Sequence, residues 1–275
     1  DAGRKRCNRS GGHVGDRFLE CDTDRHRPGR PLYRDWHAGA GCAAFCAGVV
    51  MRIASYNIRK AVGLDWRRDP LRIIRVLEGV NADVVALQEA DKRLGARPAV
   101  LPEGALYDHT GLRVLQVTNG PSSGWHGNAL LVREGWTVGA TTRLSLPGIE
   151  PRGALMADLT GPAGALTLIG THLGLRRGCR QLQLAHLLEE MSARTDTSVI
   201  AGDFNEWSPR VGFDILEHAF DVISPGRSFH ASRPIAPLDR FAVGKGLRVA
   251  RAGVFEQGEA RRASDHLPVW MDLEV

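Results

Sequence analysis

Short apolar runs that close on a polar side chain recur along this chain, and they constrain its fold more than any other feature. Apolar runs of about four to eight residues bounded by turn signals are typical of buried strands. Polar residues end or flank these runs at Asn57, Glu89, His172, Asp203 and the adjacent pair Asp265 and His266. We expect these five strand ends to converge on one site.

Short strands alternate with a few amphipathic helices from Met51 onward. Helices are predicted over residues 70–80, where Pro70 suits the first turn, and over about 179–193. Strands are predicted over residues 52–58, 83–89, 127–133, 137–144, 154–159, 165–172, 197–203, 238–243, 247–254 and 266–273. This pattern predicts an α/β protein with two mostly antiparallel sheets packed face to face and helices outside, a four-layer α/β/β/α sandwich.

The composition describes a globular chain whose main part has little excess charge. The 275 residues are 43% hydrophobic and 24% charged, with a net charge of +5. Residues 1–50 hold nine Lys or Arg and six Asp or Glu, which gives +3 and leaves +2 (5 − 3) for residues 51–275. A dedicated duplex binder normally presents a strong basic face, so this balance argues against one.

Residues 1–50 are interpreted as a disordered or non-native extension, and residues 51–275 as one domain that begins at Met51. Four of the five cysteines lie in the extension without the paired spacing of a zinc site, and Cys179 is the only cysteine of the domain. The small-residue run 38–50 is shorter than the roughly 20 apolar residues of a membrane helix, and its position does not suit a signal peptide. We therefore expect a cytoplasmic protein.

Two of the polar positions carry acids suited to phosphate chemistry. Hydrolysis of a phosphodiester needs a divalent cation, a group that activates water, and donors for the charge on the phosphate. Glu89 is a hard oxygen ligand of the kind that Mg²⁺ prefers, and the spacing of Asp203 and Asn205 predicts an amide beside a carboxylate. Taken singly, Glu89 is by default a solvated acid at a strand end, and the segment 203–205 is equally an Asx turn.

Histidines supply the remaining chemistry. His172 ends an apolar run, and His266 has two candidate acidic partners, Asp265 directly before it and Asp239 in another predicted strand. An imidazole paired with a carboxylate acts as a general base or as a charged donor near neutral pH. Because adjacent residues on a strand point to opposite faces, Asp239 is the partner expected for His266. A lone buried histidine is more often a core residue, and a lone Asn57 a turn former, but agreement among separate strands favours a common site.

Six motifs carry these residues: Ser55-Tyr56-Asn57-Ile58-Arg59, Leu87-Gln88-Glu89, Gly127-Asn128-Ala129-Leu130-Leu131, Thr171-His172-Leu173, Gly202-Asp203-Phe204-Asn205 and Ser264-Asp265-His266-Leu267-Pro268-Val269. In order and spacing they resemble the motifs of the endonuclease/exonuclease/phosphatase superfamily, in particular its small bacterial metal-dependent hydrolases. Pancreatic-type DNase, apurinic endonucleases and neutral sphingomyelinases share that fold. The resemblance covers essentially residues 51–275.

The resemblance implies a role for each matching residue. Asn57 and Glu89 correspond to metal ligands, with Asp265 beside them and Mg²⁺ or Mn²⁺ as the ion. Catalytic roles are implied for His172, Asp203, Asn205, Asp239 and His266. We expect Arg152, Arg176 and Arg177 on the substrate side, because arginine binds phosphate through paired donors. Arg59 is a departure, since apurinic endonucleases often carry an acid at that spacing.

These features predict a divalent-metal-dependent hydrolase (EC 3.1) in which water attacks a phosphodiester of a nucleic acid or a phospholipid headgroup. Two alternatives stay open: a phosphomonoesterase of the same fold, and a catalytically inactive module that binds phosphate or membrane. No obligate protein partner is evident, and a monomer is expected. Trp66, Trp125 and Trp207 lie in or near candidate loops, where an indole stacks on a base, meets a membrane surface or simply packs.

Overall fold

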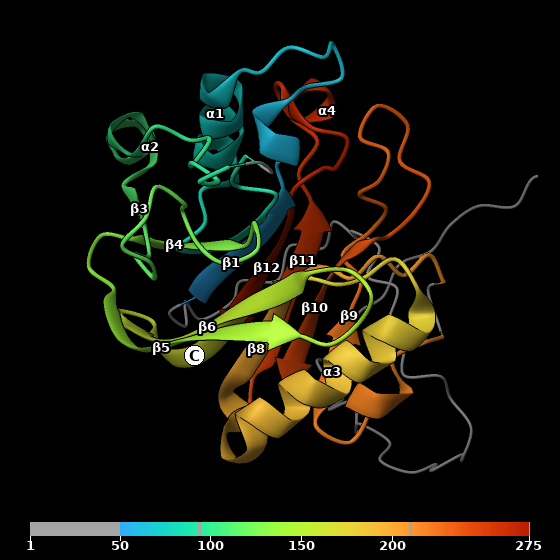
Figure 1. Ribbon diagram of the computed structural model, residues 1–275. Helices are drawn as coiled ribbons and strands as arrows, with labels where there is room; N and C mark the ends of the chain where they lie inside the picture. The colour runs from blue at the N-terminus through green and yellow to red at the C-terminus, as the bar shows by residue number, and fades with distance from the viewer. Residues whose placement is uncertain (1–49, 93–94, 209–210, 275) are drawn as a thin grey trace, which may run out of the picture. The chain divides into compact units, whose positions relative to one another are not determined.

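The computed structural model describes residues 50–92, 95–208 and 211–274. Two six-stranded sheets lie face to face in this part of the chain, with helices on their outer faces (Figure 1). The predicted four-layer α/β/β/α sandwich is confirmed. What was predicted for residues 1–49 lies outside the described residues.

The first sheet has the strand order β11-β12-β1-β2-β4-β3. Its strands are β1 (Val50–Asn57), β2 (Val84–Gln88), β3 (Leu112–Val114), β4 (Ala129–Arg133), β11 (Arg248–Val254) and β12 (Val269–Glu274). β1 and β2 run parallel with Asn57 opposite Gln88, whereas the other neighbouring pairs run antiparallel. Since parallel neighbours finish on the same side, Asn57 and Glu89, which follows β2, lie at one end of this sheet.

The second sheet has the strand order β5-β6-β7-β8-β10-β9. Its strands are β5 (Thr137–Leu146), β6 (Arg152–Gly161), β7 (Gly164–His172), β8 (Ser198–Asp203), β9 (Phe220–Ile223) and β10 (Asp239–Gly244). β7 and β8 run parallel, so their last residues, His172 and Asp203, are direct partners. β10 runs antiparallel to β8 and places its first residue, Asp239, opposite Asp203.

The helices are α1 (Pro70–Val80), α2 (Glu103–Thr110), α3 (Arg177–Met191) and α4 (Ala260–Ala263), with 3₁₀ turns η1 (Arg59–Ala61), η2 (Ser192–Thr197) and η3 (Asp214–Leu216). α1 has the bounds that its sequence predicts. Asp69 caps it by accepting a hydrogen bond from the Arg72 backbone N–H at 3.1 Å, and Asn81 ends it in the left-handed conformation with φ 50°. Among the described helices, none has the length and apolar character to span a bilayer.

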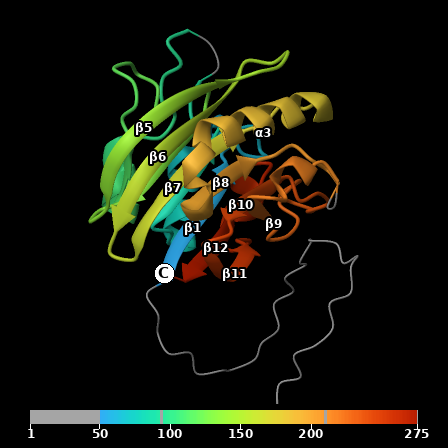
Figure 2. The ribbon, with the colours of Figure 1, turned by 90° about the horizontal axis from the view of Figure 1, so that it is seen from below.

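Alternating side chains along β1 show how the layers form. Met51 and Ile53 pack in the apolar core between the two sheets, whereas Ala54 and Tyr56 pack in the cluster beneath α1 and α2. A third cluster joins α3, through residues such as Leu184, to the outer face of the second sheet (Figure 2). Central strands are therefore buried on both faces, which explains their nearly continuous apolar sequences.

The observed elements differ from the predicted ones at several ends. α3 begins at Arg177 rather than near residue 179, and β12 begins at Val269 rather than at His266. Residues 264–268 instead form a loop, in which His266 makes an isolated bridge with Phe229. The prediction missed α2, β3, β9 and α4. Each has eight residues or fewer, too short to show a clear apolar period.

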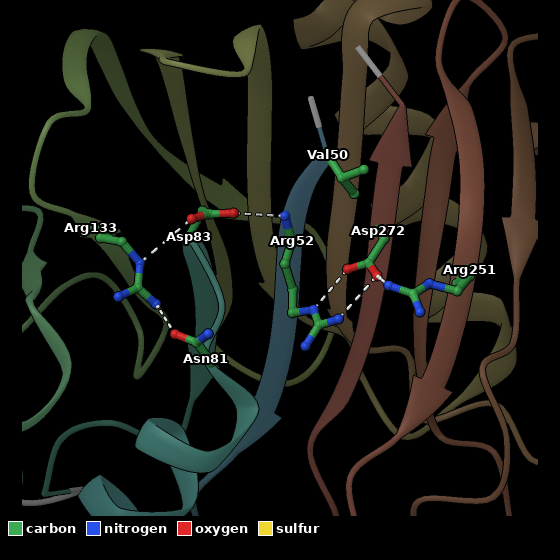
Figure 3. A pocket seen from close by; sticks show the side chains of 7 residues that line it. All are labelled: Val50, Arg52, Asn81, Asp83, Arg133, Arg251 and Asp272. Atoms are coloured by element: carbon green, nitrogen blue, oxygen red, sulfur yellow. Dashed lines mark hydrogen bonds and ion pairs between the residues drawn. The ribbon is translucent and has the colours of Figure 1, made fainter. Parts of the chain in front are cut away.

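A pocket of about 470 Å³ lies at the start of β1, and paired charges line it (Figure 3). Arg52 binds the Asp272 carboxylate through Nε at 2.7 Å and Nη2 at 3.0 Å. Arg251 Nη2 binds the same carboxylate at 2.7 Å, and Arg133 Nε lies 3.5 Å from Asp83 Oδ1. These ion pairs tie neighbouring strands of the first sheet together, and each of the three guanidinium groups has a carboxylate partner.

Asp272→Asn is expected to destabilise the fold by about 1–3 kcal/mol, because the amide cannot replace the charge-assisted hydrogen bonds to two arginines. Arg52 and Arg251 keep contact with solvent, which limits the cost. The free energy of unfolding in urea measures the effect. Glu274→Gln is the matched control on the same strand. Its partner Arg248 is 77% exposed, so a change within about 0.5 kcal/mol is expected. Equal effects for the two variants would contradict the assignment.

Candidate active site

Three polar side chains stand in a row across the second sheet. The register of β7, β8 and β10 pairs His172 with Asp203, and Asp203 with Asp239. His172 Nε2 lies 3.4 Å from Asp203 Oδ2. All three residues are buried, so the row brings two carboxylates and an imidazole together away from bulk water.

His266 joins this row from the loop that precedes β12. Its Nδ1 lies 2.8 Å from Asp239 Oδ2, and its Nε2 lies 3.7 Å from Asp203 Oδ2. Ser228 Oγ donates a hydrogen bond to the same Asp239 oxygen at 2.5 Å. The predicted pairing of His266 with Asp239 is confirmed, and Asp239 orients the imidazole toward Asp203.

The two histidines are held in opposite protonation states. Burial, together with the positive charge of Arg152, lowers the pKa of His172 to about 4 despite the attraction of Asp203. Burial also acts to lower the pKa of His266, but Asp239 and Asp203 outweigh it and raise this pKa to about 10. Near neutral pH, His172 is therefore neutral and His266 is a charged donor.

Asn57 links the two sheets at this point. Its Nδ2 donates a hydrogen bond to Asp203 Oδ2 at 3.1 Å, and its Oδ1 accepts one from the Arg59 backbone N–H at 3.1 Å. Ser264 Oγ donates to the Asn57 carbonyl at 2.7 Å, which brings the loop before β12 to the end of β1. The candidate site is thus built from strand ends of both sheets.

Asn205, whose amide the spacing predicts beside the Asp203 carboxylate, lies beyond the strand in a turn. β8 ends at Asp203, and Asn205 has a left-handed φ of 50°. Its backbone N–H donates to Asp203 Oδ1 at 2.9 Å, whereas its side-chain Nδ2 donates to the Leu173 carbonyl at 2.8 Å. The alternative of an Asx turn is therefore present, and this turn fixes the Asp203 carboxylate.

Two further carboxylates at this end of the sandwich face cations of the chain itself. Glu89 forms an ion pair with Lys60, and Asp265 Oδ2 lies 3.3 Å from Arg59 Nε. Glu89, Lys60 and Arg59 have left-handed φ values of 52°, 57° and 45°. This conformation is unfavourable for residues other than glycine and is found mainly where surrounding structure enforces it, often at functional sites. The backbone of Arg59, Lys60 and Glu89 is therefore strained at the place where these side chains form their ion pairs.

The donors at this end suit a divalent cation. The predicted metal ligands Asn57, Glu89 and Asp265 offer amide and carboxylate oxygens of the kind that Mg²⁺ prefers, and both carboxylates already attract a cationic side chain. Ligand atoms of a second group, made of Asp203, Asp239 and His266, all lie within 4.8 Å of one another. In this group Asp239 Oδ1 is buried and has no hydrogen-bond partner among the described residues, and a cation would satisfy it. Both observations fit a metal ion.

The arginines predicted on the substrate side lie in different settings. Arg152 begins β6 and is close enough to His172 to lower its pKa. Arg176 is exposed at the residue before α3. Arg177, which precedes the helix predicted over about 179–193, lies instead in the first turn of α3, and its Nε binds the Glu206 carboxylate at 3.0 Å. A role in substrate binding stays a prediction for all three arginines.

Glu206 is a structural partner of this site that the sequence reasoning missed. Its carboxylate is 3% exposed and accepts hydrogen bonds from Arg177 Nε at 3.0 Å, Arg180 Nη2 at 2.5 Å and the Ser208 backbone N–H at 2.9 Å. Burial acts to raise the pKa of Glu206, but these hydrogen bonds outweigh it and lower the pKa to about 2. The cluster fixes the loop after β8 against α3. The available signal was a pair of arginines three residues apart, Arg177 just before the predicted helix and Arg180 within it.

A two-sheet sandwich whose strand ends gather carboxylates, an asparagine and two histidines defines the class of DNase I-like hydrolases. Residues 54–266 match the Endonuclease/Exonuclease/phosphatase family, and the chain belongs to this family. Its members hydrolyse phosphate esters, so the chain is a member of a hydrolase superfamily.

Known proteins resemble the chain over most of its length. It is 28% identical over 244 residues to the uncharacterized protein YbhP of Escherichia coli, an alignment that covers 82% of this chain and 96% of YbhP. The crystal structure of an endonuclease/exonuclease/phosphatase from Beutenbergia cavernae has 21% identity and a TM-score of 0.63, covering 82% of this chain and 72% of that one. A mannosyl-6-phosphatase of Bacteroides thetaiotaomicron has 16% identity and a TM-score of 0.63, covering 81% and 99%. At these identities the solved structures support the fold.

Proposed function

We propose that this protein is a divalent-metal-dependent hydrolase that cleaves a phosphodiester by attack of water. The observation that carries the proposal is the position of the Asp203 carboxylate. It lies among Asn57, His172 and His266, and the two imidazoles differ in charge near neutral pH. A carboxylate fixed beside a charged and a neutral imidazole is an arrangement suited to acid and base chemistry.

Each side chain has a role that its contacts support. Asp203, held by the Asn205 backbone and the Asn57 amide, would orient the attacking water and take its proton. His266, charged and oriented by Asp239, would donate to a phosphate oxygen where negative charge develops. His172, neutral and buried, would assist on the leaving-group side.

The predicted ligands Asn57, Glu89 and Asp265 would hold the divalent ion, which when bound supplies Lewis-acid polarisation of the phosphoryl oxygen. Arg59 and Lys60 neutralise the two carboxylates of this set. Their positive charges would also favour a phosphate near the same strand ends.

Activity of the full chain toward bis-p-nitrophenyl phosphate tests the proposal. With Mg²⁺ or Mn²⁺ we expect turnover that EDTA lowers by about 100-fold or more and that added metal restores, because polarisation of the phosphoryl oxygen is worth several kcal/mol. Turnover that survives EDTA would rule out the proposed metal chemistry. No turnover with any divalent metal would favour the inactive phosphate-binding alternative.

A phosphomonoesterase is the second candidate, favoured by the likeness to the mannosyl-6-phosphatase. The same preparation distinguishes the two candidates with p-nitrophenyl phosphate as the monoester. A kcat/KM for the diester above that for the monoester supports the phosphodiesterase, and the reverse order supports the phosphomonoesterase.

A further inference from the structure

Trp66 is displayed to solvent in an unusual way. Its side chain is 78% exposed, the largest exposed fraction among the large apolar residues of the described chain. Its backbone has a left-handed φ of 63°, a conformation that is strongly disfavoured for a bulky residue. An indole that is both exposed and held in a strained conformation suggests that the loop presents the ring for contact with a ligand.

The loop that carries Trp66 is held by specific contacts. Residues 62–68 form a short antiparallel turn, with a bridge between Val62 and Arg68 and a hydrogen bond from the Trp66 N–H to the Gly63 carbonyl at 3.0 Å. Asp65, directly before the tryptophan, is bound by both terminal nitrogens of Arg72 at 3.1 and 2.9 Å. The backbone that carries the indole is therefore largely set before any ligand arrives, which lowers the entropic cost of binding.

Arg59 connects the indole to the candidate active site. Its guanidinium carbon lies 4.7 Å from the centroid of the Trp66 ring, and its Nε lies 3.3 Å from Asp265 Oδ2. One side chain thus covers one face of the ring and reaches a predicted metal ligand. The other face of the indole is left for a flat group attached to the phosphate that the site would bind.

The other two tryptophans of the candidate loops are bound differently. Trp125 donates its indole N–H to the Leu144 carbonyl at 3.1 Å, so it packs as an ordinary loop residue. Trp207 meets Phe229 edge-on, with ring centroids 5.9 Å apart. Arg143 also lies over the Trp125 ring, 5.0 Å from its centroid, so a covering cation is not particular to Trp66. Trp66 differs from both in its larger exposed fraction and because no other aromatic ring contacts it within the described residues.

Charge around Trp66 indicates what kind of flat group fits. Its sequence neighbours are charged and exposed: Asp65, Arg67 and Arg68. Leu71, 46% exposed at the start of α1, is the exposed large apolar residue nearest to Trp66 in the described sequence, whereas Ile149 and Leu175 belong to connections of the second sheet. An aromatic platform with arginines beside it is the pattern by which proteins bind bases and phosphates of single-stranded nucleic acid.

We propose that the open face of Trp66 is a stacking subsite for a nucleobase linked to the scissile phosphate, with Arg67 and Arg68 positioned for neighbouring phosphates. The inference rests on the proposed hydrolysis of phosphate esters and makes nucleotide esters or single-stranded nucleic acid the substrate class. Stacking on an aromatic side chain accepts any base, so Trp66 sets a preference for a base without selecting a sequence.

A pair of substrates with one leaving group tests the subsite in the full chain. The p-nitrophenyl ester of thymidine 5′-monophosphate carries a base, and methyl p-nitrophenyl phosphate does not. The ratio of their kcat/KM values should fall by about 5- to 100-fold in Trp66→Ala and be largely kept in Trp66→Phe. Leu182→Ala, which removes an exposed side chain of α3, is the control and should keep the ratio. An unchanged ratio in Trp66→Ala would overturn the proposal.

Binding without turnover separates this inference from the proposed function. In EDTA, a fluorescein-labelled oligothymidylate of eight nucleotides should bind wild-type protein more tightly than Trp66→Ala, as fluorescence anisotropy measures. Trp66-dependent binding by a protein that hydrolyses nothing would refute the proposed function and keep the subsite. Hydrolysis together with oligonucleotide binding that is the same in wild type and Trp66→Ala would keep the proposed function and refute the subsite. Loss of binding to phosphatidylglycerol vesicles in Trp66→Ala, with oligonucleotide binding unchanged, would overturn the subsite in favour of a lipid surface.

Discussion

Asp203→Asn is expected to lower kcat for bis-p-nitrophenyl phosphate by about 10²- to 10⁴-fold, the range typical of a lost general acid or base. The amide keeps the size of the carboxylate and its oxygen still accepts the Asn57 hydrogen bond. It has no negative charge with which to take a proton from water or to stabilise the charged His266, which lies 3.7 Å away. The chemical step should therefore suffer much more than folding.

Steady-state kinetics with a thermal melt of each variant measure this prediction. Asp221→Asn is the matched control, because Asp221 is an exposed acid on β9 of the same sheet. It should keep wild-type kcat. A decrease of less than tenfold in Asp203→Asn, in a folded protein, would exclude Asp203 as the group that activates water.

Glu206→Gln is expected to destabilise the protein by about 3–5 kcal/mol at pH 7, because the buried arginine of the pair loses its counter-charge. Arg180 is the partner that matters most, since its side chain is 7% exposed whereas that of Arg177 is half exposed. The cluster joins the first turns of α3 to the loop after β8. Its loss should lower the free energy of unfolding and loosen the segment that begins at Asp203.

The pH dependence of this difference has a definite sign. The pKa of Glu206 is lowered from 4.5 in a free chain to about 2 in the fold, so its ionised form is stabilised by folding. The contribution is complete above about pH 5 and is lost as the pH falls from 4.5 toward 2. The difference in unfolding free energy between wild type and Glu206→Gln should thus shrink by roughly half at pH 3.

Denaturant titrations at pH 7 and pH 3 check this dependence. Glu217→Gln, which changes an exposed acid nearby, serves as the control and should leave the free energy of unfolding within about 0.5 kcal/mol of wild type at both pH values. A difference for Glu206→Gln that stays constant or grows on acidification would contradict the assigned ion pair.

Strand positions could be predicted from the sequence where both faces of a strand are buried. Residues 165–172 and 197–203 were predicted as strands, and β7 and β8 cover nearly those residues, because each is an apolar run closed by a polar group. The pairing of Asp239 with His266 followed from the alternation of side chains, although His266 lies ahead of β12 rather than in it. The predicted partner of His266 was correct, but the argument from strand alternation applies only in part, because His266 is not itself a strand residue.

Contacts between distant segments set the details that the sequence did not reveal. The Asn205 side chain turns toward the Leu173 carbonyl, 32 residues away, and no local pattern encodes that hydrogen bond. The position of Glu206 depends likewise on arginines of α3, 26 and 29 residues earlier in the chain. The left-handed backbone of Glu89 could not be predicted either, because glutamate prefers other conformations. Tertiary contacts decide each of these features.

The hydrogen bond between Asn57 and Asp203 has a consequence for how the protein acquires its activity. The two residues are 146 positions apart and belong to different sheets, and Ser264, 207 positions beyond Asn57, closes over the same strand end. Neither sheet alone contains all the residues of the candidate site. During synthesis the site can assemble only after the segment around Ser264 has emerged and both sheets have docked, so hydrolytic activity reports completion of folding.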